Sequence, residues 1–271
     1  MSKRDLVFRT PLMNAAGTLG FYPTGTRAPE ARAATIAPVG GEWADFGAFV
    51  TNPLSLRPRA PTADPHMLPY SGGFLLHTGL PNPGLSATLK AYAVRWAAAK
   101  LPIIVHLMAD RPEETAQMVQ HLENVENVAA VELGFAPLLA NDIILLAVEM
   151  SLGELPLIVS LPWEQVLTLG PRLIQTGASA ISLSAPHGAL PLNTDHRKPP
   201  NGDRLITGRL YGPSLFPQAL ALVHDAARIG LPIIGGGGVY SQENVDAMLA
   251  AGAFSVQLDG LLWRSGWQPH K

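Results

Sequence analysis

The chain has 271 residues, contains no cysteine and carries a formal net charge of -2 at pH 7. The lack of cysteine excludes disulfides, thiolate metal sites, iron–sulfur clusters and any cysteine nucleophile or base. The charge balance gives no basic surface for nucleic acid or an anionic membrane, and no apolar run reaches the roughly 18 residues of a membrane span. Because 47% of the residues are hydrophobic and no signal peptide is recognisable, we expect a globular cytoplasmic protein.

Eight short apolar runs recur along the chain, and most are continuous rather than alternating in polarity. Continuous runs of this kind are typical of parallel strands buried on both faces. The predicted strands are residues 11–17, 46–52, 102–108, 129–135, 155–161, 178–185, 231–238 and 253–260. Amphipathic stretches predict helices at residues 87–99, 111–123, 141–152, 163–175, 215–228 and 241–250.

This alternation of eight strands with helices is the pattern of a (β/α)8 barrel. We therefore predict an α/β fold, with one TIM-barrel domain over residues 1–271. A doubly wound sheet is the alternative, but no G-x-G-x-x-G fingerprint follows the first strand. The long connections 53–84 and 186–210 follow predicted strands, so we expect them to form lid loops at the C-terminal mouth, where barrel enzymes keep their sites.

The strongest local signal is a run of four glycines, residues 235–238, followed by a predicted helix. Near the end of the eighth strand stands a further glycine, Gly260. Glycines at the ends of strands 7 and 8 allow backbone N–H groups to converge on a phosphate. The alternative is that these glycines only permit sharp turns and close helix packing.

Five segments, taken in chain order, together match one known family over nearly the whole chain. They are Asn-Ala-Ala-Gly-Thr at 14–18, Asn-Pro and Arg-Pro-Arg at 52–53 and 57–59, Gly-Leu-Pro-Asn-Pro-Gly at 79–84, Gly-Arg-Leu-Tyr-Gly-Pro at 208–213, and the stretch 233–257. These segments resemble the strand ends and loops of dihydroorotate dehydrogenases, which are FMN-binding barrels. In that family a base removes a proton from dihydroorotate while a hydride passes to FMN.

The resemblance implies a set of cofactor-binding residues in this chain. The FMN phosphate would meet Gly236, Gly237, Gly238 and Gly260. The flavin ring would lie over Ala16, Gly17, Asn52 and Ser160, and Gly212 is also expected to bind the cofactor.

The chain departs from the family's pattern where the chemistry is performed. Of the family's two lysines near the flavin, one is replaced by Asn52 and the other by Ser160. A positive charge near the flavin pyrimidine stabilises the anionic reduced form, so its loss weakens hydride acceptance. The segment at the end of the fourth strand, which supplies substrate amides and the base, here offers only Glu132 as a proton acceptor.

Three further departures concern ligand binding. Asp259 and Gly260 stand where the family has Gly-Thr at the phosphate, and a carboxylate about 4 Å from a phosphate costs roughly 1 kcal/mol even in water. Tyr211 replaces a flavin-contacting serine and would be able to stack on a ligand ring. The substrate-binding asparagine corresponds to the pair Leu76 and His77.

We therefore predict a dihydroorotate-dehydrogenase-like flavin oxidoreductase with an altered substrate or reduced activity. The alternative is a non-catalytic barrel that binds a partner. As partners we expect a small-molecule ligand at the barrel mouth, no nucleic acid and no membrane, and we leave a homodimer open.

Other residues give weaker signals. Acid–base chemistry near neutral pH would be open to His77, His106, His187 and His196, although a single histidine is more often structural. His106 with Glu132 and Asp259 would be able to hold a divalent metal, but no His-x-His spacing supports this, and we predict no metal. Arg57 and Arg59 are expected to be solvated loop residues, and Trp263 and Trp267 packing or interface anchors.

Overall fold

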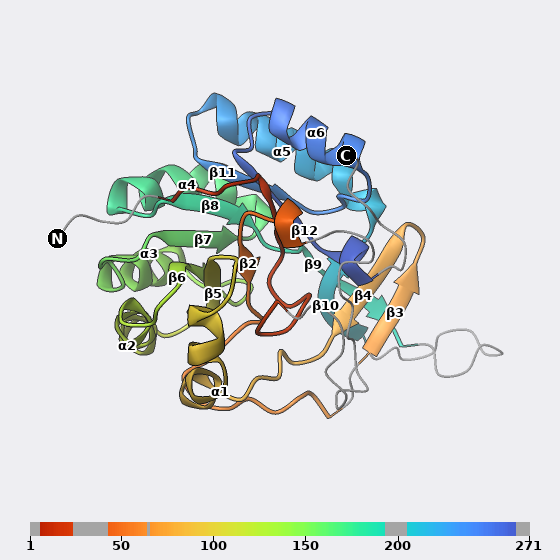
Figure 1. Ribbon diagram of the computed structural model, residues 1–271. Coiled ribbons are helices and arrows are strands. Elements are labelled where there is room, and N and C mark those ends of the chain that lie inside the picture. The colour runs from red at the N-terminus through yellow and green to blue at the C-terminus, as the bar shows by residue number, and fades with distance from the viewer. Residues whose placement is uncertain (1–5, 24–42, 64–65, 193–204, 264–271) are drawn as a thin grey trace.

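The computed structural model describes residues 6–23, 43–63, 66–192 and 205–263. In this part of the chain eight parallel strands form a barrel in the order β1-β12-β11-β8-β7-β6-β5-β2, and a parallel bridge from Met13 to Ala48 closes it (Figure 1). The strands are β1 (Leu12–Asn14), β2 (Phe49–Val50), β5 (Ile103–Met108), β6 (Val128–Gly134), β7 (Leu157–Leu161), β8 (Ala180–Leu183), β11 (Ile233–Gly236) and β12 (Ser255–Leu258). The predicted (β/α)8 architecture is confirmed.

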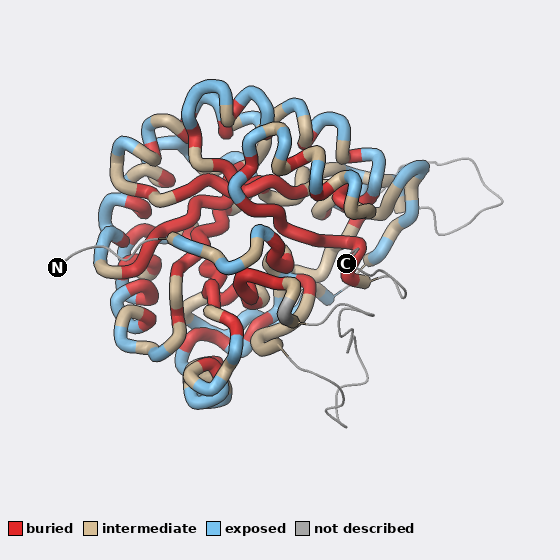
Figure 2. The backbone as a smooth tube through the Cα atoms, turned by 45° about the horizontal axis from the view of Figure 1, so that its top comes forward, coloured by how far each residue is buried: buried red, intermediate tan, exposed pale blue. Residues whose placement is uncertain are grey.

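Six α-helices in the described residues surround the barrel, and each matches a predicted helix with ends displaced by a few residues. They are α1 (Leu85–Ala97), α2 (Pro112–Glu123), α3 (Asn141–Met150), α4 (Trp163–Thr176), α5 (Phe216–Arg228) and α6 (Gln242–Ala250). Helix α2 begins at a proline followed by two glutamates, and the Ser241 hydroxyl caps α6 by accepting the N–H of Asn244. Figure 2 shows the buried strands inside and the exposed outer faces of the helices.

The inside of the barrel is built in layers, because alternate residues of each strand point inward. One layer is apolar and contains Met13, Ala48, Val50, Ile104, Ala130, Ile158, Ala180 and Ile234. Two residues further along four of these strands stand His106, Glu132, Ser160 and Ser182, all buried. The layer nearest the C-terminal mouth is therefore polar, and it forms the floor of a site.

The two long connections form a second, four-stranded antiparallel sheet in the order β3-β4-β10-β9, which we call the lid sheet. The connection after β2 supplies β3 (His66–Tyr70) and β4 (Gly73–His77). The connection after β8 supplies β9 (His187–Pro191) and β10 (Leu205–Tyr211). In Figure 1 the lid sheet lies beside the C-terminal ends of the barrel strands.

Some predictions fall outside the described residues, namely those for His196 and Trp267. No helix in the described ranges is long and apolar enough to cross a membrane. The assignment of residues 1–271 to one domain stays a prediction.

Candidate functional site

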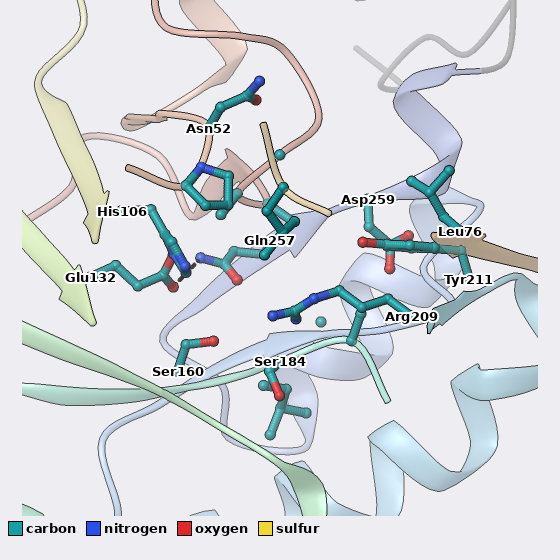
Figure 3. Close-up of a pocket in the computed structure, with 18 of the residues that line it drawn as sticks. Asn52, Leu76, His106, Glu132, Ser160, Ser184, Arg209, Tyr211, Gln257 and Asp259 are labelled. Carbon is teal, nitrogen blue, oxygen red and sulfur yellow. Dashed lines mark hydrogen bonds and ion pairs between the residues drawn. The ribbon is translucent and has the colours of Figure 1, made fainter. Parts of the chain in front are cut away.

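Two adjoining cavities, of about 230 and 270 Å³, open between the barrel mouth and the lid sheet. Their walls share Pro53, Leu76, Thr78, Leu80, His106, Arg209 and Tyr211. Together they reach the size of a small-molecule pocket, which spans roughly 300–1,000 Å³ in proteins. We call the smaller one, which lies on the polar layer, the mouth cavity (Figure 3).

Six of the nine predicted cofactor residues line the mouth cavity: Ala16, Gly17, Asn52, Ser160, Gly236 and Gly237. The other three, Gly212, Gly238 and Gly260, do not line it. A Cβ added to Gly212 would stand 2.2 Å from the carbonyl oxygen of Gly72. This glycine therefore allows the chain just after β10 to pack closely on the turn between β3 and β4. The structure thus brings most of the predicted residues together, while their role in binding a cofactor stays a prediction.

Asn52 holds the loop after β1 at the edge of the mouth cavity. Its side-chain oxygen accepts the N–H of Gly20 at 3.1 Å, and its backbone N–H donates to the Gly20 carbonyl at 2.7 Å. The loop that carries Ala16 and Gly17 is therefore fixed against the end of β2.

A buried hydrogen-bond network forms the floor of the mouth cavity, centred on Glu132. The Oε2 atom of Glu132 lies 2.7 Å from Nδ1 of His106. Its Oε1 atom accepts hydrogen bonds from Ser182 at 2.6 Å and from Gln257 at 2.8 Å. These four side chains come from four different strands, so the network also ties the barrel together.

Glu132 is a fixed anion in this network. Burial alone raises the pKa of its carboxyl, but the hydrogen bond and charge of His106, with the bonds from Ser182 and Gln257, outweigh burial and lower that pKa below its usual value. With both oxygens occupied, Glu132 orients His106 rather than accepting a proton from a ligand. Gly134 makes room for the imidazole, because a Cβ there would stand 2.3 Å from Nε2 of His106.

Arg209 of β10 reaches from the lid sheet into the mouth cavity, where its guanidinium lies near Ser184 and Gln257 (Figure 3). Among the described residues its guanidinium has no hydrogen-bond or ion-pair partner. In the family resemblance, the segment Gly-Arg-Leu-Tyr-Gly at 208–212 stands where the family has Gly-Gly-Leu-Ser-Gly, so Arg209 takes the place of a glycine. The chain has therefore placed a positive charge in the cavity on a strand different from those that carry the family's lysines.

Asp259 stands at the end of β12 and is buried. Its Oδ1 atom accepts the backbone N–H of Gly260 at 2.5 Å. Burial raises the pKa of this carboxyl to about 6, although the nearby backbone N–H groups of Gly260, Asp259 itself and Gly238 lower it. The backbone at the ends of β11 and β12 therefore surrounds a carboxylate of the chain itself.

Tyr211 lines the mouth cavity while its ring takes part in aromatic packing, and its stacking on a ligand ring stays a prediction. Its ring packs on Phe74, with 5.5 Å between the centroids, and meets the edge of Trp263 at 5.2 Å. The indole N–H of Trp263 donates to the Thr18 carbonyl, so this tryptophan is a packing residue, as predicted. Burial raises the pKa of Tyr211 to about 12.

The remaining candidates take secondary positions. His77 and His187 line the larger cavity, and burial, followed by the charge of Arg209, lowers the pKa of His187. Arg57 and Arg59 are exposed, as predicted, and Arg59 also donates to the Gly79 carbonyl within the lid connection. In the described residues no group of three acidic or histidine side chains that could hold a metal ion occurs.

Sequence reasoning missed the roles of Arg209, Ser182 and Gln257. A signal for the latter two exists, since Ser182 is the polar residue of the apolar strand β8, and Gln257 is a polar residue between apolar ones near the end of strand β12. Nothing in the sequence shows that Arg209, on a strand of the lid sheet, reaches the floor of the barrel.

The fold and this cavity define a (β/α)8-barrel protein with a lidded small-molecule site at the C-terminal ends of its strands. No model of a known protein family matches the chain. It is 30% identical to the catalytic subunit of dihydroorotate dehydrogenase B (NAD(+)) of Pelobacter propionicus, over 93% of this chain and 84% of that protein. The corresponding subunits of Geotalea daltonii and Geotalea uraniireducens are 29% and 27% identical, each over 92% of this chain and 82% of theirs. The chain belongs to the dihydroorotate dehydrogenase family.

Proposed function

We propose that this chain is a flavin oxidoreductase-like member of the family with an altered activity, which binds a small anionic molecule at the mouth of its barrel. The observation that carries this proposal is the mouth cavity itself. Six predicted cofactor residues still line it, whereas the lysines, the substrate amides and the base of the family are replaced. A retained cavity with changed polar groups supports binding with changed chemistry.

The residues of the mouth cavity fit the ring of a flavin better than the phosphate of FMN. The ring would be held by Ala16, Gly17 and Asn52 on one side and by Gly236 on another, where an added Cβ would have no heavy atom nearer than 3.5 Å. The phosphate does not fit, because the Asp259 carboxylate already accepts the N–H of Gly260 and lies beside the N–H of Gly238. A bound flavin ring would supply a hydride acceptor, and the chain supplies no lysine at Ser160 to stabilise its reduced form.

The charges of the mouth cavity favour an anionic ligand. The Arg209 guanidinium enters the cavity without a partner among the described side chains, and a planar guanidinium suits a carboxylate. His106 also lines the cavity, and its Nε2 atom, unlike Nδ1, has no hydrogen-bond partner among the described residues, so we assign proton exchange with a ligand to this atom. Glu132 holds the imidazole in place through Nδ1, as a buried carboxylate does for a proton-exchanging histidine.

A titration of the purified full-length protein tests this proposal. We expect riboflavin or FMN to change its visible absorbance on binding, and dihydroorotate to bind without reducing the flavin under anaerobic conditions. Arg209→Gln should weaken dihydroorotate binding at least tenfold, whereas Arg172→Gln, which removes an exposed arginine of α4, should not. Reduction of the flavin by dihydroorotate would refute the altered activity, and the absence of any flavin binding would refute the flavin site.

A second candidate function is a non-catalytic barrel that binds a ligand or a partner protein. The observation that favours it is the combined loss of the lysine at Ser160 and of a base in the segment after Glu132. Ligand binding without turnover of any flavin would support this alternative. For both candidate functions we also propose a cytoplasmic location and a homodimer. Analytical sedimentation would detect the homodimer.

A further inference from the structure

Asp259 stands between the mouth cavity and the backbone N–H groups that the family resemblance assigns to a phosphate. Its carboxylate lines the mouth cavity, whereas Gly238 and Gly260 do not. The N–H group of Gly260 donates to this carboxylate, and the N–H group of Gly238 lies near enough to it to lower its pKa. The backbone at the ends of β11 and β12 therefore forms an anion site, and the Asp259 side chain fills this site from the side of the mouth cavity.

The surroundings leave this anion site no second place for a phosphate. A Cβ added to Gly238 would stand 2.4 Å from the backbone nitrogen of Phe216, and one added to Gly260 would stand 2.2 Å from the hydroxyl of Tyr240. Packed protein therefore fills the space beside both glycines. A phosphate bound here would have to displace the Asp259 carboxylate or lie in contact with it. Two anions in contact repel each other.

We propose that the Asp259 carboxylate is a built-in substitute for a ligand phosphate, so that the mouth cavity selects phosphate-free ligands. For a flavin this means riboflavin in preference to FMN. The choice of riboflavin rests on the flavin site proposed above, but the exclusion of phosphate does not. A carboxylate satisfies backbone N–H groups as a phosphate does, whereas the glycines themselves are required because a Cβ at either position would clash.

The experiment compares inorganic phosphate, FMN and riboflavin as ligands of the full-length protein by calorimetric titration. The original chain should bind no phosphate at millimolar concentration and should bind riboflavin at least tenfold more tightly than FMN. Asp259→Ala, which empties the anion site, should gain phosphate binding and bind FMN at least tenfold more tightly than the original chain, with riboflavin changed less than threefold. Asp259→Ser is a second variant that empties the site and retains a polar side chain.

The control is Asp225→Ala, which removes an exposed carboxylate of α5 with the same change in net charge and should gain no phosphate binding. The proposal is overturned if phosphate raises the melting temperature of the original chain, if the original chain prefers FMN, or if neither folded Asp259 variant gains phosphate. Phosphate binding gained without any flavin binding would uphold this inference while refuting the flavin site. The measurements on the original chain decide the question even if both variants fail to fold.

Discussion

Glu132 is the residue on which the polar floor of the mouth cavity depends, because three buried side chains make hydrogen bonds to it. A buried anion of this kind is tolerated only when its partners satisfy it, and removing one member leaves the others unpaired. Its sequence context, an acidic residue within an apolar strand, already marks it as unusual. Its partners come from strands far away in the sequence, so they could not be predicted.

We expect Glu132→Gln to lower the free energy of unfolding at pH 7 by about 2–4 kcal/mol, because the neutral amide no longer matches its three donors. The pKa of Glu132 is lowered in the folded protein, so its ionised form stabilises the fold above the unfolded value of about 4.5. That stabilisation is lost as the pH falls through the lowered folded pKa. Urea unfolding at pH 7 and at pH 3 measures the difference, which should shrink at the lower pH.

Glu149→Gln on the exposed face of α3 is the matched control, and its effect should stay within about 0.5 kcal/mol. An equally small effect of Glu132→Gln would contradict the role assigned to the network.

The stability that Asp259 contributes depends on pH in the opposite sense to that of Glu132. The pKa of Asp259 is raised from 3.8 to about 6 in the folded protein, so the ionised form is less favourable in the fold than in the unfolded chain. The stabilisation that the protonated carboxyl gives the folded protein is fully present below pH 3.8 and is lost as the pH rises through 6. Relative to Asp259→Asn, the original chain should therefore gain about 1 kcal/mol of stability when the pH falls from 7 to 5.

Urea unfolding of both proteins over that pH range measures this gain, with Asp225→Asn, an exposed substitution, as the reference. A constant difference between the original chain and Asp259→Asn would show that the folded carboxyl is not perturbed.

At the scale of elements, the regular strands and helices were predictable because each carries its own pattern. Continuous apolar runs predict the barrel strands, and features such as Pro112 and Ser241 mark helix starts. The strands of the lid sheet were not predicted individually. The residues of β3 alternate only between partly buried and exposed, and the sheet is completed by the pairing of β4 with β10, which lies more than 100 residues away in the chain.

The aromatic cluster of Phe74, Tyr211 and Trp263 fastens the lid sheet to the barrel end. We expect Phe74→Ala to lower the protection of β4 and β10 amides by about 1–3 kcal/mol in hydrogen exchange, because the ring contacts with both partners are lost. Met67→Ala, on an exposed position of β3, is the matched control. Equal protection in both variants would mean that other contacts hold the lid sheet.

At the scale of the whole molecule, closure of the barrel depends on the seam between β1 and β2. The two short strands share the single bridge from Met13 to Ala48. The Asn14 side chain supplements it by donating to the Val50 carbonyl at 2.6 Å and accepting the Val50 N–H at 2.9 Å. A side-chain amide thus replaces a pair of strand hydrogen bonds.

We expect Asn14→Ala to lower the free energy of unfolding by about 2–3 kcal/mol, because two buried backbone groups of Val50 lose their partners. Chemical denaturation measures this loss of unfolding free energy. Asn141→Ala, at the exposed start of α3, serves as the control. A loss under about 0.5 kcal/mol would mean that the seam closes without Asn14.

The sequence by itself determined the fold class, the lidded mouth and the glycines at the ends of β11 and β12. It did so because periodicity, chain length and turn chemistry are local properties of the chain. Only the tertiary structure decided how the site is charged. Whether Asp259 meets Gly238, whether His106 meets Glu132, and whether Arg209 enters the mouth cavity depend on the closure of the barrel and the docking of the lid sheet, which bring together residues distant in the sequence.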